Sequence, residues 1–67
     1  MRILLLGANG MLGPYVIAAL EDEHQLRLTD INDAPETKHE YIKLDVLDLE
    51  GVIAAAEGMD VIVNLSV

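Results

Sequence analysis

Three glycines stand at equal intervals near the start of the chain, in the stretch LGANGMLG. Gly7 follows the run from Arg2 to Leu6, which suits a buried strand, and Gly10 and Gly13 precede a segment with helical periodicity. The start of a helix leaves backbone N–H groups unpaired and carries a partial positive charge, so it attracts anions. Glycines at that point let an anionic pyrophosphate approach the main chain. The spacing therefore predicts a dinucleotide-binding loop.

Each of the three glycines has its own predicted role in such a loop. Gly7 permits the tight turn out of the strand, Gly10 leaves room for the pyrophosphate, and Gly13 lets the helix pack closely on the strand. The alternative is a glycine-rich turn that binds nothing, because glycines at this spacing also occur by chance.

Two aspartates add to the glycine pattern. Asp30 ends the second predicted strand, 17 residues beyond Gly13, where an acidic residue of a dinucleotide fold accepts hydrogen bonds from the adenosine ribose. Asp33 is nearby and is the competing candidate, but the strand pattern ends at Asp30. Asp45 directly follows the third predicted strand and could accept a hydrogen bond from an adenine amino group. A plain turn acid is an equal alternative for Asp45.

The rest of the sequence supplies the elements that must position these residues. A continuous apolar run at 2–6 predicts a strand covered on both faces. A helix is expected within 11–23, with its buried face formed by Leu12, Val16, Ala19 and Leu20. Further strands are predicted at 25–29, 41–44 and 60–67, and a second helix at 49–57, between Asp48 as N-cap and Gly58 as stop. This alternation predicts an α/β fold: a Rossmann-like parallel sheet with flanking helices, here only a part of one.

Composition narrows the classes of function. The 67 residues carry a net charge of −8, which disfavours nucleic acid and anionic membranes as partners. There is no cysteine, hence neither a disulfide nor a thiolate metal site. His24 and His39 have no ligand-like spacing and are expected to be solvated surface residues rather than metal ligands. No signal peptide is recognisable, so a cytoplasmic protein is expected.

The chain is too short for two domains, and its last residues form an apolar strand with no helix after it. We expect residues 1–67 to be the amino-terminal portion of a larger NAD(P)-binding Rossmann domain. The alternative is a complete small domain that covers its last strand by oligomerising.

These stretches together resemble the extended short-chain dehydrogenase/reductase family, the NAD-dependent epimerase/dehydratase group. LGANGMLG resembles its glycine motif, LTD its ribose-binding strand end, KLDVLD its adenine-side motif, and MDVIVNLSV the strand that ends beside the nicotinamide half. The resemblance runs from Arg2 to Val67. It implies NAD as cofactor and the following cofactor-binding residues: Gly7, Asn9, Gly10, Met11, Leu12, Gly13, Asp30, Ile31, Asp45, Val46, Leu65, Ser66 and Val67.

Members of this family transfer hydride with a Tyr-x-x-x-Lys pair, which this sequence lacks. Tyr15 is followed four residues on by Ala19, and Tyr41 by Asp45. The resemblance therefore implies no catalytic residue within the chain, and the chain alone is expected to be inactive. Leu6, Asn64 and Ser66 also depart from residues that are common in the family, which leaves the subfamily open.

Three functions follow from this sequence. The leading one is the amino-terminal portion of an NAD-dependent epimerase, dehydratase or reductase that acts on nucleotide sugars, with a homodimeric parent. The second is a non-catalytic dinucleotide-binding sensor, and the third is an interaction domain without a ligand. NAD is preferred over NADP because Asp30 would repel a 2′-phosphate. The nearest cations in sequence, Arg27 and Lys38, do not stand at the strand end.

Overall fold

A four-stranded parallel sheet forms the centre of the computed structural model, which describes residues 1–66. The strands lie in the order β3-β2-β1-β4. Their bounds are β1 (Arg2–Leu6), β2 (Gln25–Asp30), β3 (Glu40–Lys43) and β4 (Val61–Asn64). The fold class expected from the sequence is confirmed.

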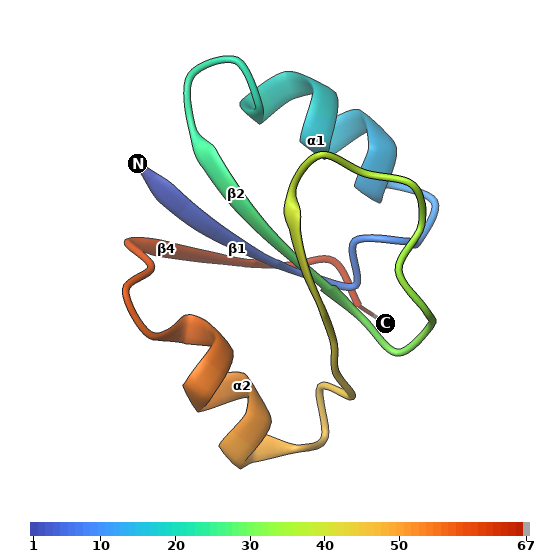
Figure 1. Cartoon of the computed structure of the whole chain (residues 1–67), viewed down its shortest axis with the longest axis vertical. Helices are drawn as coiled ribbons and strands as arrows, with labels where there is room; N and C mark the ends of the chain where they lie inside the picture. Colours follow the sequence, from blue (N-terminus) through green and yellow to red (C-terminus); the bar gives the residue numbers. More distant parts are fainter. Residues whose placement is uncertain (67) are drawn as a thin grey trace.

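Two helices cover opposite faces of this sheet (Figure 1). α1 (Gly13–Leu20) connects β1 to β2, and α2 (Leu49–Ala56) connects β3 to β4. A loop without a helix joins β2 to β3. Neither helix is long and apolar enough to cross a bilayer, within the part of the chain that the structure describes.

The apolar run of β1 explains why both faces of the sheet are covered. Ile3 and Leu5 belong to the core under α1, whereas Leu4 and Leu6 belong to the core under α2. All four side chains are buried. Successive strand residues point to opposite faces, so an unbroken apolar run needs a cover on each side.

The buried face of α1 agrees with the prediction at Val16 and Leu20 and differs from it elsewhere. Val16, Ile17 and Leu20 pack on the core, whereas Leu12 and Ala19 are exposed. The helix begins at Gly13, which is buried, and positions three, four and seven residues further on lie on the same face. The contact made by Gly13 therefore sets which side of the helix faces the sheet.

The second helix begins and ends close to the predicted residues. The Asp48 carboxylate caps it by accepting a hydrogen bond from Gly51 N at 3.1 Å, as expected of an N-cap. At its other end Arg27 Nη1 donates to the carbonyl oxygens of Ala55, at 2.6 Å, and Glu57, at 3.0 Å. A cation from β2 thus satisfies the carbonyls at the helix end. Gly58 follows with φ +78°, the left-handed conformation that stops a helix.

Two strands, β3 and β4, end earlier in the sequence than predicted. β3 stops at Lys43, and the chain then turns between Asp45 and Asp48, whose backbone N donates to the Asp45 carbonyl at 2.9 Å. β4 stops at Asn64, whose side-chain oxygen accepts from Ser66 N at 3.0 Å. Side chains of Asn and Asp that bond to the backbone two residues on produce such turns. The predicted end of the last strand, Val67, lies outside the described residues.

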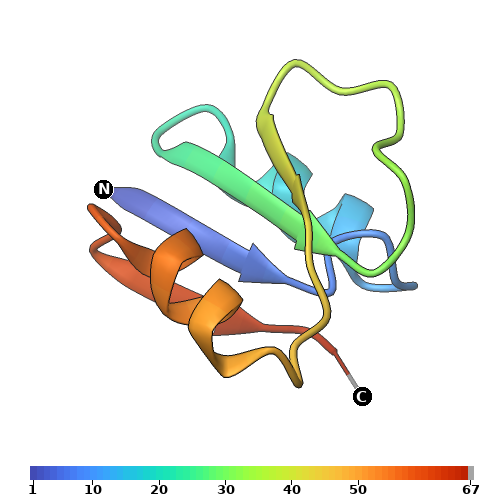
Figure 2. The same cartoon turned by 60° about the horizontal axis from the view of Figure 1, so that its bottom comes forward.

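The strand order defines where a ligand would lie. From β1 the chain passes to β2 and β3 on one side, and then to β4 on the other. Figure 2 shows the loops after β1 and β2 leaving the sheet at the same edge, near the end of β4. In open parallel sheets, ligands bind at the carboxyl ends of the strands, where the strand order reverses. That point lies between the ends of β1 and β4.

Candidate functional site: the carboxyl edge of the sheet

Gly7 turns the chain out of β1 with φ +78°. A Cβ at this position would lie 2.7 Å from Ser66 N and 3.0 Å from the carbonyl carbon of Leu65. Glycine is therefore required for two reasons: the left-handed backbone and the close approach of the chain after β4. Leu65 N also donates to the Leu6 carbonyl at 2.8 Å, which holds the two strand ends together.

The other two glycines differ in how much space surrounds them. A Cβ on Gly10 would meet a single atom within 4 Å, the carbonyl oxygen of Gly7 at 3.3 Å. A Cβ on Gly13 would overlap the carbonyl group of Ala8. Gly13 thus allows a close approach as expected, but to the loop residue Ala8 rather than to the strand itself.

The start of α1 has no side-chain cap. Leu12 occupies the N-cap position, Pro14 stands in the first turn, and that turn holds no acidic residue. α2 differs, since Asp48 caps it. Gly13 N already donates to the Gly10 carbonyl at 3.1 Å, but an uncapped helix start keeps its partial positive charge, which attracts an external anion.

Asp30 ends β2 beside the loop of residues 7–12, called the glycine loop below, as the sequence predicts. Its Oδ2 accepts a hydrogen bond from Asn9 N at 3.0 Å, and its Oδ1 accepts from the backbone N and side-chain Nδ2 of Asn32, both at 3.2 Å. A carboxylate has about four acceptor positions, so one remains on Oδ2. Asp33, the competing candidate, instead pairs with Lys43 Nζ at 2.9 Å, and that bond lowers the pKa of the Asp33 carboxyl.

A cavity of about 360 Å³ opens next to Asp30. Its lining includes five of the residues predicted from the sequence, together with Leu44 and Leu47. The five are Gly7, Asp30, Ile31, Asp45 and Val46. They come from the ends of three neighbouring strands and the loops that follow them.

Apart from Asp30, the cavity lining offers apolar surface and the carboxylate of Asp45, which bonds to its own turn. Ile31 is 60% exposed and Val46 is 38% exposed, so both offer apolar surface to a flat ring. Asp45 Oδ1 accepts from Leu47 N at 2.9 Å. Asp45 is thus a turn acid in this structure, and its second oxygen is the one that could accept from a ligand.

The remaining predicted residues lie around the mouth of this edge. Met11 and Leu12 are exposed and have apolar side chains, so only their backbone N–H groups are suited to bind an anion. Leu65 and Ser66 pass directly over Gly7. Val67, the last predicted residue, lies outside the described residues.

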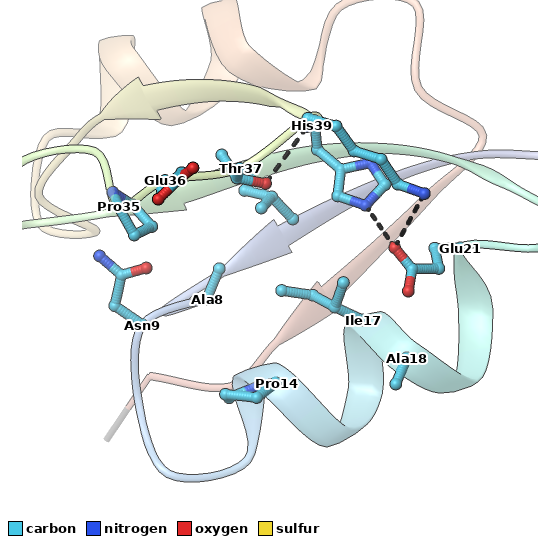
Figure 3. A pocket seen from close by; sticks show the side chains of 12 residues that line it. Ala8, Asn9, Pro14, Ile17, Ala18, Glu21, Pro35, Glu36, Thr37 and His39 are labelled. Atoms are coloured by element: carbon cyan, nitrogen blue, oxygen red, sulfur yellow. Dashed lines mark hydrogen bonds and ion pairs between the residues drawn. The ribbon is translucent and has the colours of Figure 1, made fainter.

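A second cavity, of about 680 Å³, lies between α1 and the 35–39 loop (Figure 3). Its rim carries Glu21, whose Oε1 lies 2.9 Å from His39 Nε2 and 3.6 Å from Lys38 Nζ. The His39 bond is the main cause of the lowered pKa of Glu21. The prediction that His39 is a solvated surface residue is wrong: its side chain is only 12% exposed, because it packs at the end of α1.

Tyr41 and Asn32 are polar residues of the site that were not predicted from the sequence. Tyr41 OH donates to the Asn32 carbonyl at 2.6 Å and accepts from Asn9 Nδ2 at 3.0 Å. Burial raises the pKa of Tyr41, and the nearby Asp30 carboxylate raises it further. No local pattern reveals these contacts, because they depend on how β2 and β3 are aligned.

Comparison with known proteins agrees with this arrangement. A model of the NAD dependent epimerase/dehydratase family matches residues 3–67. No protein among the curated sequences matches the chain.

Solved structures of uronate dehydrogenases share the fold. The enzyme from Agrobacterium tumefaciens is 34% identical with a TM-score of 0.81, over 96% of this chain and 25% of that one. A mutant of the same enzyme complexed with NAD gives the same values. A third structure, a mutated uronate dehydrogenase, is 32% identical with a TM-score of 0.81, over 98% of this chain and 26% of that one.

The chain thus spans about a quarter of the length of these solved neighbours. NAD, the cofactor expected from the sequence, is confirmed at the level of the family, which the matching model describes as NAD dependent. The family match covers almost every residue, from the first strand to the last. This chain belongs to the NAD dependent epimerase/dehydratase family.

Proposed function

We propose that this chain binds NAD at the carboxyl edge of its sheet. One observation carries the proposal: Asn9 N donates to Asp30 Oδ2 at 3.0 Å, so the ribose-type carboxylate and the glycine loop adjoin. The pyrophosphate would lie on the glycine loop and the uncapped start of α1, and the ribose hydroxyls would take the remaining acceptor position of Asp30.

The other predicted residues take roles around these two. Gly10 leaves the space for the pyrophosphate, and the backbone N–H groups of Met11 and Leu12 are its candidate donors. Ile31 and Val46 are suited to hold the adenine ring, with the second oxygen of Asp45 as acceptor for its amino group. Leu65, Ser66 and Val67 would border the nicotinamide half.

The charges near Asp30 support NAD over NADP. Lys38 lies 3.6 Å from Glu21 at the far end of α1, and Lys43 is paired with Asp33 at 2.9 Å. Both cations therefore have carboxylate partners, and neither is paired with Asp30 among the described residues. Among the described residues, a 2′-phosphate placed here would meet the Asp30 carboxylate with no unpaired lysine beside it.

We further propose that residues 1–67 are the amino-terminal portion of the Rossmann domain of an NAD-dependent oxidoreductase. NAD supplies the hydride acceptor in such a reaction. A nucleotide sugar is the substrate expected from the family resemblance. A sugar acid is the second candidate, because the solved neighbours are uronate dehydrogenases. A homodimeric, cytoplasmic parent completes the proposal.

Calorimetric titration of the full-length protein tests this function. We expect NAD and ADP-ribose to bind, because both carry the adenosine ribose and the pyrophosphate. Turnover of NAD with a panel of nucleotide sugars and of uronates then separates the two substrate classes. If the protein binds no adenine dinucleotide, the proposal is wrong and the glycine loop is a turn without a ligand.

A further inference from the structure

Four residues from three separate segments form a closed ring of hydrogen bonds at the carboxyl edge of the sheet. They are Asn9 in the glycine loop, Asp30 and Asn32 at the end of β2, and Tyr41 in β3. The ring runs from Asn9 N to the Asp30 carboxylate, from that carboxylate to Asn32, from the Asn32 carbonyl to Tyr41 OH, and from there to the Asn9 side chain. It therefore fixes the glycine loop relative to the Asp30 carboxylate.

Tyr41 is the only ring member that stands outside the expected cofactor contacts and their immediate neighbours. Its hydroxyl uses both of its capacities, since it donates to Asn32 O at 2.6 Å and accepts from Asn9 Nδ2 at 3.0 Å. Its ring is partly buried and packs against the core under α1. The pKa of a tyrosine hydroxyl is ordinarily 10.0, and burial raises that of Tyr41, so the hydroxyl is protonated and can donate at neutral pH.

The glycine loop has few other side-chain ties. Within segment 7–12, the bond from Asn9 Nδ2 to Tyr41 is the only hydrogen bond made by a side chain, among the residues that the structure describes. Other bonds that hold this segment use backbone groups, such as Ala8 N to the Thr29 carbonyl at 2.9 Å. Loss of the Tyr41 hydroxyl would leave the Asn9 side chain without this partner, and the loop would then be held to the Asp30 carboxylate by the bond from Asn9 N at 3.0 Å alone.

We propose that Tyr41 is a positioning residue for cofactor binding, which holds the glycine loop and the ribose carboxylate at a fixed separation through Asn9 and Asn32. This inference rests on the proposed function, because it assumes that the edge holds NAD. Tyr41 itself contacts no cofactor in this proposal. Its effect is to order the site before binding, so that less ordering is required when the ligand arrives.

The test is the affinity of Tyr41→Phe in the full-length protein. Phenylalanine keeps the packed ring and removes only the hydroxyl. We expect NAD and ADP-ribose to bind about three- to tenfold more weakly, as loss of one or two neutral hydrogen bonds implies. In turnover assays KM for NAD should rise by a similar factor while kcat is unchanged. Tyr15→Phe is the matched control, because Tyr15 is 76% exposed on α1, and it should bind as the wild type does.

A double-mutant cycle separates positioning from a general loss of stability. If Tyr41 acts through Asn9, Tyr41→Phe should weaken NAD binding little further in an Asn9→Ala background. Thermal melts run beside the titrations verify that each variant is folded. Wild-type affinity in Tyr41→Phe, or fully additive effects of the two substitutions, would overturn the inference. Absence of NAD binding by the wild type would instead overturn the proposed function, so the two failures are distinguishable.

Discussion

Gly13 and Ala8 approach so closely that no side chain fits between the start of α1 and the loop after β1. A Cβ on Gly13 would overlap the Ala8 carbonyl group, which is backbone and cannot turn aside. This contact seats α1 on the sheet, because Val16, Ile17 and Leu20 share the face that Gly13 begins. The same contact places the glycine loop at the start of the helix.

Gly13→Ala should therefore destabilise the protein. Alanine in a helix gains up to about 1 kcal/mol over glycine, but overpacking against rigid backbone costs about 1–3 kcal/mol or more. We expect a net loss of roughly 2 kcal/mol in the free energy of unfolding, measured by urea denaturation. The matched control is Gly10→Ala, because its Cβ would meet only Gly7 O at 3.3 Å. Equal stability of the two variants would refute the role given to the Gly13 contact.

Gly10→Val should affect binding rather than folding. The Gly10 backbone is not in the left-handed conformation, and a Cβ there would meet a single atom within 4 Å, the carbonyl oxygen of Gly7 at 3.3 Å. A branched side chain would occupy the room that the pyrophosphate needs. We expect NAD affinity to fall at least about tenfold, a difference of about 1.4 kcal/mol.

Titration calorimetry beside a thermal melt measures this difference. Tyr15→Val is the control, because Tyr15 is exposed on α1 and lines neither cavity. It should leave the NAD affinity unchanged. A folded Gly10→Val variant that binds NAD as tightly as the wild type would show that no pyrophosphate lies there.

The Glu21–His39 bond should make stability depend on acidity. The pKa of Glu21 is lowered from its ordinary value of 4.5, mainly by the hydrogen bond with His39. A carboxyl with a lowered pKa in the folded protein stabilises it above the ordinary pKa, and this contribution is lost as the pH falls through the lowered value. The difference in unfolding free energy between wild type and Glu21→Gln should therefore shrink below about pH 4.5.

Urea denaturation at a series of pH values from neutral to acid measures that difference. Glu23→Gln is the control, because Glu23 follows Glu21 by two residues and makes no ion pair among the described residues. Its difference from wild type should not change over the same interval. A constant difference for Glu21→Gln would mean that the bond to His39 contributes no stability in solution.

The sequence predicted the residues whose neighbours in the chain determine their place. Asp30 could be placed because the alternation of β2 ends there, and Gly7 because a turn must follow an apolar strand. The Asn9–Tyr41 bond could not, because it joins residues 32 positions apart and depends on the register of β2 with β3. His39 was misjudged for the same reason: its partner Glu21 lies across a loop that has no pattern of its own.

The register of β2 with β3 also places a cation, Lys43, next to Asp30, although the two residues are far apart in the sequence. Lys43 is the strand partner of Asp30 in the β2–β3 ladder, although it stands 13 residues further along the chain. Its Nζ pairs with Asp33 at 2.9 Å, and this bond raises the pKa of Lys43. Asp33 thus neutralises the one cation whose strand position adjoins Asp30, among the described residues.

Asp30 should decide between NAD and NADP. The 2′-hydroxyl of NAD can donate to the carboxylate, whereas the 2′-phosphate of NADP would face it with no proton between them. We expect the wild type to prefer NAD at least about tenfold, a difference of about 1.4 kcal/mol. Asp30→Ala should lose most of this preference, measured as the ratio of the two dissociation constants.

Two variants separate charge from loop order, because Asp30 also accepts the bond from Asn9 N. Asp30→Asn keeps an acceptor oxygen for that bond and removes the negative charge, so it should lose the preference for NAD yet bind both cofactors better than Asp30→Ala. Asp33→Asn should leave Asp30 in place but release Lys43, and NADP affinity should then rise. Equal affinity of the wild type for NAD and NADP would contradict the role of Asp30. A preference for NAD that survives in Asp30→Asn would instead assign the discrimination to the shape of the loop after β2.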